Sequence, residues 1–293
     1  MILLTGASGT VGRALLRRLT ASGERVRCLV RDPRRLGPDR VRVQIALGDL
    51  GNPASFRHAL RGVDTVVHLA ATIRDQPPVG SIEELNGVAT LRLIRAAERV
   101  GAERFLFFSA MGASLNSRAR FMAAKALAEE AVAESDLATA VFAPSIVYSP
   151  GDPWLTLLER MSLLPAVPIS GSGRALFQPI WADDVADCVM AALGSGDEGR
   201  RRFELAGPES VSYDDIVVLA LRSFRRRRPL VHVPLPAVKA GLTVVERLAG
   251  PAAFATWDEA QLMEIPMTTP KGTADAEALG VSPLSMSTVL GAA

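Results

Sequence analysis

The chain has 293 residues, of which 48% are hydrophobic, enough to bury one large core or one core with a smaller lobe beside it. Its formal net charge is only +2, and no aromatic residues interleave with its longest basic run, Arg225 to Arg228, so nucleic-acid binding is not expected. Cys28 and Cys188 both lie in apolar runs, which predicts two buried thiols rather than a disulfide and suits a reducing, cytoplasmic compartment.

The first predicted strand, residues 2–4, runs directly into a glycine turn. This leaves no room for a charged leader and a cleavage site, so we expect the mature protein to begin here. Charged residues interrupt the apolar stretches further along. The segment 236–255 carries Lys239, Glu246 and Arg247, so it predicts an amphipathic helix packed on a core, or at most resting on a membrane, rather than a spanning helix.

Short apolar runs alternate with helical patterns through the first half of the chain. This alternation predicts an α/β fold with a doubly wound parallel Rossmann sheet, whose ligand lies beyond the carboxyl ends of the strands. The expected strands are six: 2–4, 26–30, 41–47, 65–69, 105–109 and 139–143. The expected helices of this part are 11–21, 53–61, 84–100 and 118–135.

Beyond residue 143 the pattern is broken by proline and glycine, and only 182–193 and 213–224 predict helices with clear periodicity. We therefore expect a dinucleotide-binding domain over residues 1–148, to which 174–196 returns. Residues 149–173 and 197–293 are expected to form a smaller α/β lobe that faces a substrate or a partner.

The segment Thr5-Gly6-Ala7-Ser8-Gly9-Thr10-Val11-Gly12 joins the first strand to the first helix. One glycine permits a tight turn, a second lets the backbone approach a pyrophosphate, and a third allows close contact between helix and strand. Free N–H groups at the start of the helix then meet the phosphate charge. Because this turn follows a strand and opens a helix, it predicts a dinucleotide site rather than an ordinary glycine turn.

The second strand ends at Val30-Arg31-Asp32. An acid at the strand tip normally binds the adenosine ribose, whereas Arg31 can pair with a 2′-phosphate, with Arg34 or Arg35 as a second contact. We therefore expect NADP(H) to be preferred, while Asp32 leaves NAD(H) open and a solvated Arg31 is the alternative. Asp49, just after the third strand, is either an acceptor for the adenine amine or a turn aspartate.

These residues resemble the short-chain dehydrogenase/reductase superfamily in its extended and atypical branches, with the Thr-Gly-x-x-Gly-x-x-Gly turn as the first match. Further matches in order include Asp49-Leu50, His68-Leu69-Ala70-Ala71, Ser109, Lys125 and the segment 181–186. The stretch from Ser109 to Glu129 most resembles the group of the NAD(P)H-binding accessory subunit of respiratory complex I. The resemblance implies that Asp49, Leu50, Leu69, Ala70 and Ala71 line the adenosine half and that Pro144, Ser145, Ile146 and Val147 border the nicotinamide.

The chain departs from the superfamily at its catalytic motif, Tyr-x-x-x-Lys. It has Phe121-Met122-Ala123-Ala124-Lys125, so Phe121 replaces the usual tyrosine on the helix face that it shares with Lys125. In the usual mechanism, the phenol protonates a carbonyl oxygen as hydride arrives, a contribution of roughly 10²–10⁴-fold. We therefore expect simple ketone reduction by that route to be severely impaired.

Two catalytic residues of the pattern remain, Ser109 and Lys125. Lys125 is expected either to bond the nicotinamide ribose or to be a solvated lysine, and Ser109 either to polarise a substrate oxygen or to cap its strand. Tyr148 is a possible substitute donor, although packing is the favoured interpretation.

Other titratable residues predict structural roles. Asp183 and Asp184 are expected to cap a helix and to offset its dipole rather than to bind a metal. The three histidines, His58, His68 and His232, are too widely spaced for a local ligand motif, and packing is the favoured interpretation.

Two functions are compatible with these residues. The first is an NADPH-dependent reductase of an apolar small molecule, such as a quinone or conjugated acceptor, that needs no strong acid from the protein. The second is a non-catalytic cofactor-binding subunit or sensor, whose apolar lobe docks on a protein partner or a membrane surface.

Overall fold

The computed structural model describes residues 1–195, 199, 201–250 and 253–291. Its centre is a seven-stranded sheet in which all neighbouring strands are parallel, with the order β11-β6-β5-β4-β1-β2-β3. The strands are β1 (Ile2–Thr5), β2 (Val26–Val30), β3 (Gln44–Leu47), β4 (Thr65–His68), β5 (Arg104–Phe108), β6 (Ala138–Pro144) and β11 (Arg201–Leu205). The predicted doubly wound α/β fold is therefore confirmed.

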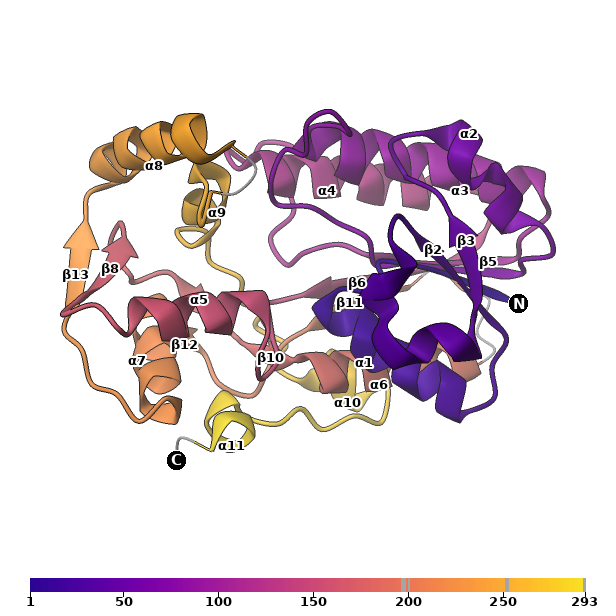
Figure 1. Cartoon of the computed structure of the whole chain (residues 1–293). Helices are drawn as coiled ribbons and strands as arrows, with labels where there is room; N and C mark the ends of the chain where they lie inside the picture. Colours follow the sequence, from indigo (N-terminus) through magenta and orange to yellow (C-terminus); the bar gives the residue numbers. More distant parts are fainter. Residues whose placement is uncertain (196–198, 200, 251–252, 292–293) are drawn as a thin grey trace.

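Two helical layers cover this sheet, one on each face (Figure 1). One face carries α1 (Thr10–Ala21) and α6 (Ala182–Gly194), which pack together over a core that includes Leu15 and Val189. The other carries α3 (Ala89–Arg99) and α4 (Arg120–Ala133) over a second core that includes Leu93 and Phe105. Shorter elements complete this part: η1 (Pro33–Arg42), α2 (Pro53–Phe56), η2 (Arg57–Leu60) and the π-helical η3 (Glu84–Val88).

The prediction of six strands was wrong, because β11 adds a seventh strand at the edge of the sheet. Residues 201–205 were expected in the smaller lobe, yet they pair with β6 from Arg201↔Ala140 to Leu205↔Pro144. The sequence Arg-Arg-Phe-Glu-Leu buries only Phe203 and Leu205, and a strand with so few apolar residues resembles a loop. The predicted boundary between residues 196 and 197 lies outside the described residues.

A second group of elements forms around its own apolar core, which includes Tyr148, Phe177 and Ile216. Three two-stranded sheets belong to it: β7 (Val147–Tyr148) with β10 (Ile180–Trp181), β9 (Leu176–Phe177) with β12 (Val211–Ser212), and β8 (Val167–Ser170) with β13 (Leu230–Val233). Its helices are α5 (Pro153–Met161), α7 (Tyr213–Ser223), α8 (Leu235–Ala249), α9 (Trp257–Leu262) and α11 (Met286–Leu290), while α10 (Ala274–Glu277) lies against β11.

The amphipathic helix expected within residues 236–255 is present as α8, but it does not pack on a core. None of its residues is buried, and Val244 and Leu248 are exposed. Its contacts include α9, where Lys239 lies over the ring of Trp257. In the described part of the chain, no helix combines the length and the hydropathy of a membrane span.

Candidate functional site

A groove of about 330 Å³ opens at the carboxyl ends of β1, β2 and β4, where the strand order reverses. In open parallel sheets this switch point is where ligands bind. Among the predicted residues, the groove is lined by Gly6, Ser8, Gly9, Arg31, Arg35, Asp49, Leu50, Leu69, Ala70 and Ala71. The structure thus brings the predicted adenosine and pyrophosphate residues together, and their contact with a cofactor stays a prediction.

The glycine turn is built without space for side chains at two of its three glycines. Gly6 has φ +74°, and a Cβ there would lie 2.6 Å from the backbone nitrogen of Ala70. A Cβ on Gly12 would lie 2.1 Å from the carbonyl oxygen of Gly6. At Gly9, by contrast, the nearest atom to such a Cβ is that same oxygen at 3.3 Å, so Gly9 presents bare backbone to the groove.

Helix α1 begins directly after this turn with no side-chain cap. Gly9 is its N-cap residue, and no acidic residue lies in the first turn, where Thr10, Val11 and Gly12 stand. The first N–H groups of a helix have no partner within it, and the helix dipole adds partial positive charge there. This end of α1 therefore fits an anionic group such as a pyrophosphate.

Arg31 lies at the tip of β2 and lines the groove, as predicted from the sequence. Its side chain is 48% exposed, its Nη1 donates to Oε1 of Gln76 at 2.6 Å, and Nη1 is 3.8 Å from Oδ2 of Asp49. The sequence left a solvated side chain as the alternative for Arg31. In the structure the side chain is half exposed and is also held at the groove wall by its bond to Gln76. Arg35 also lines the groove, whereas Arg34 is exposed outside it.

The two acids near Arg31 have structural partners of their own. Asp32 accepts a hydrogen bond from the backbone N–H of Arg34 and so caps the 3₁₀ helix η1. Asp49 accepts from the N–H of Gly51 at 2.8 Å, which is the turn role, while its other oxygen faces Arg31. Both roles considered for Asp49 are therefore compatible with its position.

Lys125 is buried, with 2% of its surface exposed, so the solvated lysine considered from the sequence is wrong. Its Nζ donates to the carbonyl oxygen of Phe108 at 2.5 Å and lies 4.9 Å from the ring centroid of Phe107. Burial lowers the pKa of this amine from 10.5 to about 7, while the charge of Glu129 acts in the opposite direction. The side chain thus points towards β5.

Phe121 stands one helical turn before Lys125, with its ring centroid 5.7 Å from Nζ. The ring packs on the apolar core of the second group of elements and has no proton to give. Ser109, at the end of β5, is buried, and its hydroxyl has no hydrogen-bond partner among the described residues. The strand-capping role is therefore not seen among the described residues, and the role of this hydroxyl towards a substrate stays a prediction.

The residues expected near the nicotinamide follow β6. Pro144 ends that strand and accepts from the N–H of Met111, Ile146 packs on the same core as Phe121, and Val147 lies in β7. Tyr148 is fully buried, and its hydroxyl has no hydrogen-bond partner within the part of the chain that the structure describes. Burial together with the charge of Asp184 raises its pKa above the ordinary value. A phenol with a raised pKa is a poor acid, which favours the packing role.

His68 links the glycine turn to the helix layer from inside β4. Its Nδ1 lies 2.7 Å from Oγ1 of Thr5 and its Nε2 lies 3.0 Å from Oγ1 of Thr90. Burial lowers its pKa to about 3, and the charge of Lys125 acts in the same direction, so the ring is neutral near pH 7. The expected packing role applies to His68, whereas His58 and His232 are exposed, and His232 pairs with Asp214.

Several residues that were not predicted for the site also line the groove, among them Thr72, Gln76 and Leu85. Gln76 and Thr72 lie in the loop that follows β4, and Nε2 of Gln76 donates to Oγ1 of Thr72 at 2.9 Å. This loop has neither periodicity nor a recognisable motif. Only the folded chain shows that it meets the tip of β2.

Helix α9 is joined to the edge of this region by ion pairs. Arg74 binds Glu259 at 2.6 Å, and Arg120 at the start of α4 binds Glu83 at 2.6 Å and Asp258 at 3.3 Å. The Arg120 guanidinium lowers the pKa of Glu83 to about 2. These pairs hold α9 beside the first turn of α4, the helix that carries Phe121 and Lys125.

The acidic pair at 183 and 184 does not cap α6, because Trp181 is the N-cap residue and makes no side-chain cap. Both acids lie in the first turn, which is consistent with dipole compensation. Asp183 pairs with Arg18 at 2.7 Å, and Asp184 accepts from the N–H of Leu284. These contacts join α6 to α1 and to the C-terminal segment.

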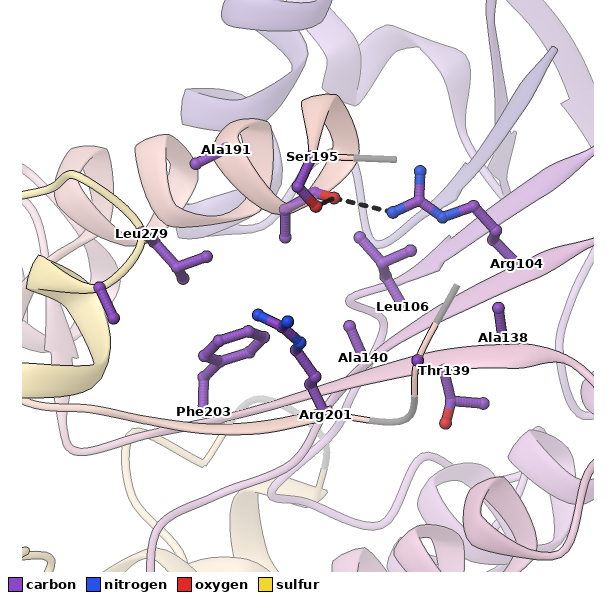
Figure 2. Close-up of a pocket in the computed structure, with 13 residues that line it drawn as sticks. Arg104, Leu106, Ala138, Thr139, Ala140, Ala191, Ser195, Arg201, Phe203 and Leu279 are labelled. Carbon is purple, nitrogen blue, oxygen red and sulfur yellow. Dashed lines mark hydrogen bonds between the residues drawn. The ribbon is translucent and has the colours of Figure 1, made fainter. Parts of the chain in front are cut away.

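A second cavity, of about 190 Å³, lies between the strands β5, β6 and β11 and the end of α6 (Figure 2). Its wall includes Arg104 at the start of β5, whose Nη2 donates to the carbonyl oxygen of Ala192 at 2.7 Å and whose Nη1 donates to that of Leu193 at 2.9 Å. A guanidinium in this position satisfies the last carbonyl groups of α6 and offsets its dipole. Arg104 therefore has a structural role.

Comparison with known proteins agrees with this geometry. The sequence profile of a family described as NAD(P)H-binding matches residues 6–196. The chain is 29% identical to the mitochondrial NADH dehydrogenase [ubiquinone] 1 alpha subcomplex subunit 9 of Arabidopsis thaliana, over 80% of this chain and 60% of that one. It is 27% identical to ceramide reductase of Caulobacter vibrioides, over 81% and 75% of the two chains.

The fold is also similar to a solved structure, that of MoeE5 in complex with UDP-glucose and NAD. The TM-score is 0.76, with 22% identity, and the superposition covers 99% of this chain and 96% of the other. At this identity the likeness concerns the fold alone.

Proposed function

The chain belongs to the NAD(P)H-binding family whose profile covers residues 6–196, and from this premise we propose that it is an NADPH-dependent reductase of an apolar, electron-poor acceptor. The acceptor class is a quinone or a conjugated double bond. The observation that carries the proposal is the contrast between an intact nucleotide groove and a helix α4 on which Phe121 replaces the acid. Such acceptors take hydride without a strong acid from the protein.

The groove fits the cofactor by three features: bare backbone at Gly9, uncapped N–H groups at the start of α1, and a guanidinium at the tip of β2. Gly9 and the first turn of α1 would hold the pyrophosphate, and Asp49 would bind the adenine. NADPH, when bound, supplies the hydride. Lys125 and Ser109 would orient the nicotinamide end and the acceptor, while Phe121 and Ile146 would keep that end apolar.

The preference for NADP(H) over NAD(H) rests on the neighbours of Arg31. Asp32, which would bind a ribose 2′-hydroxyl, has one of its two carboxylate oxygens engaged in capping η1. Arg31 and Arg35 both line the groove, and a guanidinium pairs with a phosphate in a bidentate way. The two free, buried cysteines suit a reducing compartment such as the cytoplasm.

A second function is a cofactor-binding subunit or sensor without turnover. The structure favours it at one point, since Nζ of Lys125 is already bonded to the carbonyl oxygen of Phe108 rather than free for a ligand. The plant relative is, by name, a subunit of a larger enzyme. A bound cofactor then stabilises the fold by RT ln(1 + [L]/Kd).

One experiment separates the two functions. The purified protein is incubated with NADPH and a panel of quinones and enones, and cofactor oxidation is followed by absorbance while binding is measured by calorimetry. Steady oxidation supports the reductase, and tight binding without turnover supports the subunit. If neither NADPH nor NADH binds, both proposals are wrong.

A further inference from the structure

An apolar turn between α5 and β8 stands exposed at the surface. Leu163 is 66% exposed and Leu164 is 46% exposed, and the exposed Pro165 follows them. The two-stranded sheet of β8 and β13 lies at the end of the molecule opposite the strands β2 and β3 of the Rossmann sheet (Figure 1). A large part of each leucine therefore faces solvent in the described chain.

The arginine run that follows α7 is fixed against this turn. Nη1 of Arg226 donates to Oγ of Ser162 at 3.0 Å, and Nε of Arg228 donates to the carbonyl oxygens of Ser162 and Leu164 at 3.1 and 2.9 Å. Both guanidinium groups therefore hold the backbone of the turn in place. Arg225 and Arg227 are exposed beside them.

These residues concentrate positive charge. Arg160 and Arg225–Arg228 form a cluster of five arginines, whereas the whole chain has a formal net charge of +2. This cluster, together with Leu163 and Leu164, is here called the basic turn. No arginine of the cluster forms an ion pair with a carboxylate in the described residues. The exposed Glu159 is the nearest acidic residue along the chain.

We propose that the basic turn docks the protein on an anionic lipid surface, with Leu163 and Leu164 inserted among the headgroups. Two exposed leucines bury apolar surface at the boundary of the acyl chains, and arginines at the same level meet the phosphate and carboxylate groups of the lipids. Neither contribution alone gives stable anchoring, and membrane association of this kind uses both.

Charge and polarity disfavour the other occupants. A nucleic acid satisfies the arginines but leaves both leucines in water, since bases stack on aromatic side chains and the basic turn consists of arginines and leucines. A second copy of the chain, docked through the same patch, brings two clusters of arginines together and is repelled. The basic turn shares no residue with the lining of the nucleotide groove, so a docked protein keeps that groove open to its ligand.

The test is co-sedimentation of the full-length protein with vesicles of phosphatidylcholine alone, or of phosphatidylcholine with phosphatidylserine. We expect binding to the anionic vesicles only, and a loss of that binding as salt concentration rises. The double variant Leu163→Asp/Leu164→Asp should lower the vesicle partition coefficient by at least about tenfold. The variant Arg225→Asn/Arg227→Ser should lower it by about fivefold per arginine; asparagine is chosen because Arg225 has φ 57°.

Two matched controls test the location of the surface. Leu248→Asp changes an exposed leucine on α8, and Arg95→Ala/Arg99→Ala removes two exposed arginines from α3. Both controls should bind vesicles as the wild type does, and the thermal midpoint of every variant is measured to show that it is folded. Should Leu248→Asp lose as much binding as the double leucine variant, the docking surface is α8 and the proposal is wrong.

Three further results overturn the proposal. One is equal binding to neutral and anionic vesicles, or to neither. Another is binding to a DNA duplex that equals the vesicle binding and does not change in the Leu163→Asp/Leu164→Asp variant. The third is a dimer in analytical ultracentrifugation that dissociates in that variant, which assigns the patch to a second copy of the chain.

Discussion

Nη1 of Arg31 donates a hydrogen bond to Oε1 of Gln76 at 2.6 Å and so joins the tip of β2 to the loop after β4 across the wall of the nucleotide groove. The guanidinium is also 3.8 Å from Asp49. Both contacts are weaker than the one that a phosphate would make with this guanidinium. A neutral amide and a carboxylate 3.8 Å away bind it less strongly than a doubly charged phosphate that accepts two hydrogen bonds. Arg31 is therefore held near the groove without being saturated.

The first prediction follows from this position. Arg31→Ala should weaken NADPH binding by roughly ten- to a hundredfold, since a hydrogen bond to a charged group contributes about 1.5–3 kcal/mol. NADH affinity should change by less than about threefold. Calorimetry with both cofactors is the measurement, and Arg34→Ala, which changes an exposed arginine outside the groove, is the control. Equal losses for NADPH and NADH would contradict the 2′-phosphate assignment.

The second prediction separates two glycines of the same turn. Gly9→Ala should fold with a loss of stability of about 1 kcal/mol, because the N-cap backbone there is extended and the carbonyl oxygen of Gly6, 3.3 Å from the new Cβ, has to move only slightly. It should still lose at least about tenfold in affinity for either cofactor, since the methyl group occupies the path of the pyrophosphate.

Gly12→Ala is the matched counterpart. Its Cβ would lie 2.1 Å from the carbonyl oxygen of Gly6, so we expect a destabilisation of about 2–4 kcal/mol in urea denaturation. If Gly9→Ala binds NADPH as the wild type does, the pyrophosphate does not lie against this turn.

The fold could be predicted largely because parallel buried strands and amphipathic helices differ in hydrophobic period. The predicted strands 26–30 and 65–69 became β2 (Val26–Val30) and β4 (Thr65–His68), since each is a short, mostly apolar run. The seventh strand could not be found, because an edge strand needs few apolar residues and β11 buries two. Predicted strand 41–47 was also too long: β3 begins at Gln44, after η1 has taken residues up to Arg42.

The candidate site was predictable where a motif fixes the backbone and not where a loop returns from elsewhere. The glycine turn and Arg31 follow from local sequence, since both lie at the ends of predicted strands. Gln76 could not be anticipated, because its position depends on the path of a loop without periodicity. The burial of Lys125 was equally hidden, since an amphipathic helix pattern does not show that its polar residue faces the sheet.

The third prediction concerns the missing acid. Phe121→Tyr places a phenol one turn before Lys125, where the ring centroid is 5.7 Å from the amine. We expect the rate of NADPH-dependent ketone reduction to rise by at least about tenfold, because general acid catalysis contributes roughly 10²–10⁴-fold. Quinone reduction should change by less than about twofold, since it does not use this proton. The absorbance of NADPH, followed in parallel reactions with a ketone and with a quinone as acceptor, measures both rates.

Phe121→Leu is the control for packing, because it changes the ring without adding a proton donor. It should alter neither rate by more than about twofold if the hydroxyl is the cause. A rise in quinone reduction in Phe121→Tyr that matches the rise in ketone reduction would show that the two acceptors use the same proton, against the proposed mechanism.

The fourth prediction is a pH dependence of stability that comes from the buried amine of Lys125. Burial lowers its pKa from 10.5 to about 7, so the folded protein disfavours the ammonium form that the unfolded chain retains up to about pH 10. The cost is fully present below pH 7 and vanishes as the pH rises through 10.5, because the unfolded chain then also loses its proton. At about 1.4 kcal/mol per pKa unit, the effect is at most about 5 kcal/mol.

The replacement Lys125→Met removes this titration while keeping a long apolar side chain. The free energy of unfolding of the wild type should therefore rise relative to that of Lys125→Met between about pH 7 and pH 10, as measured by urea denaturation at several pH values. The comparison cancels the titration of every other group that the two proteins share. If the two curves run parallel with pH, the ammonium is not penalised in the fold, and the bond to the carbonyl oxygen of Phe108 together with the ring of Phe107 compensates for its burial.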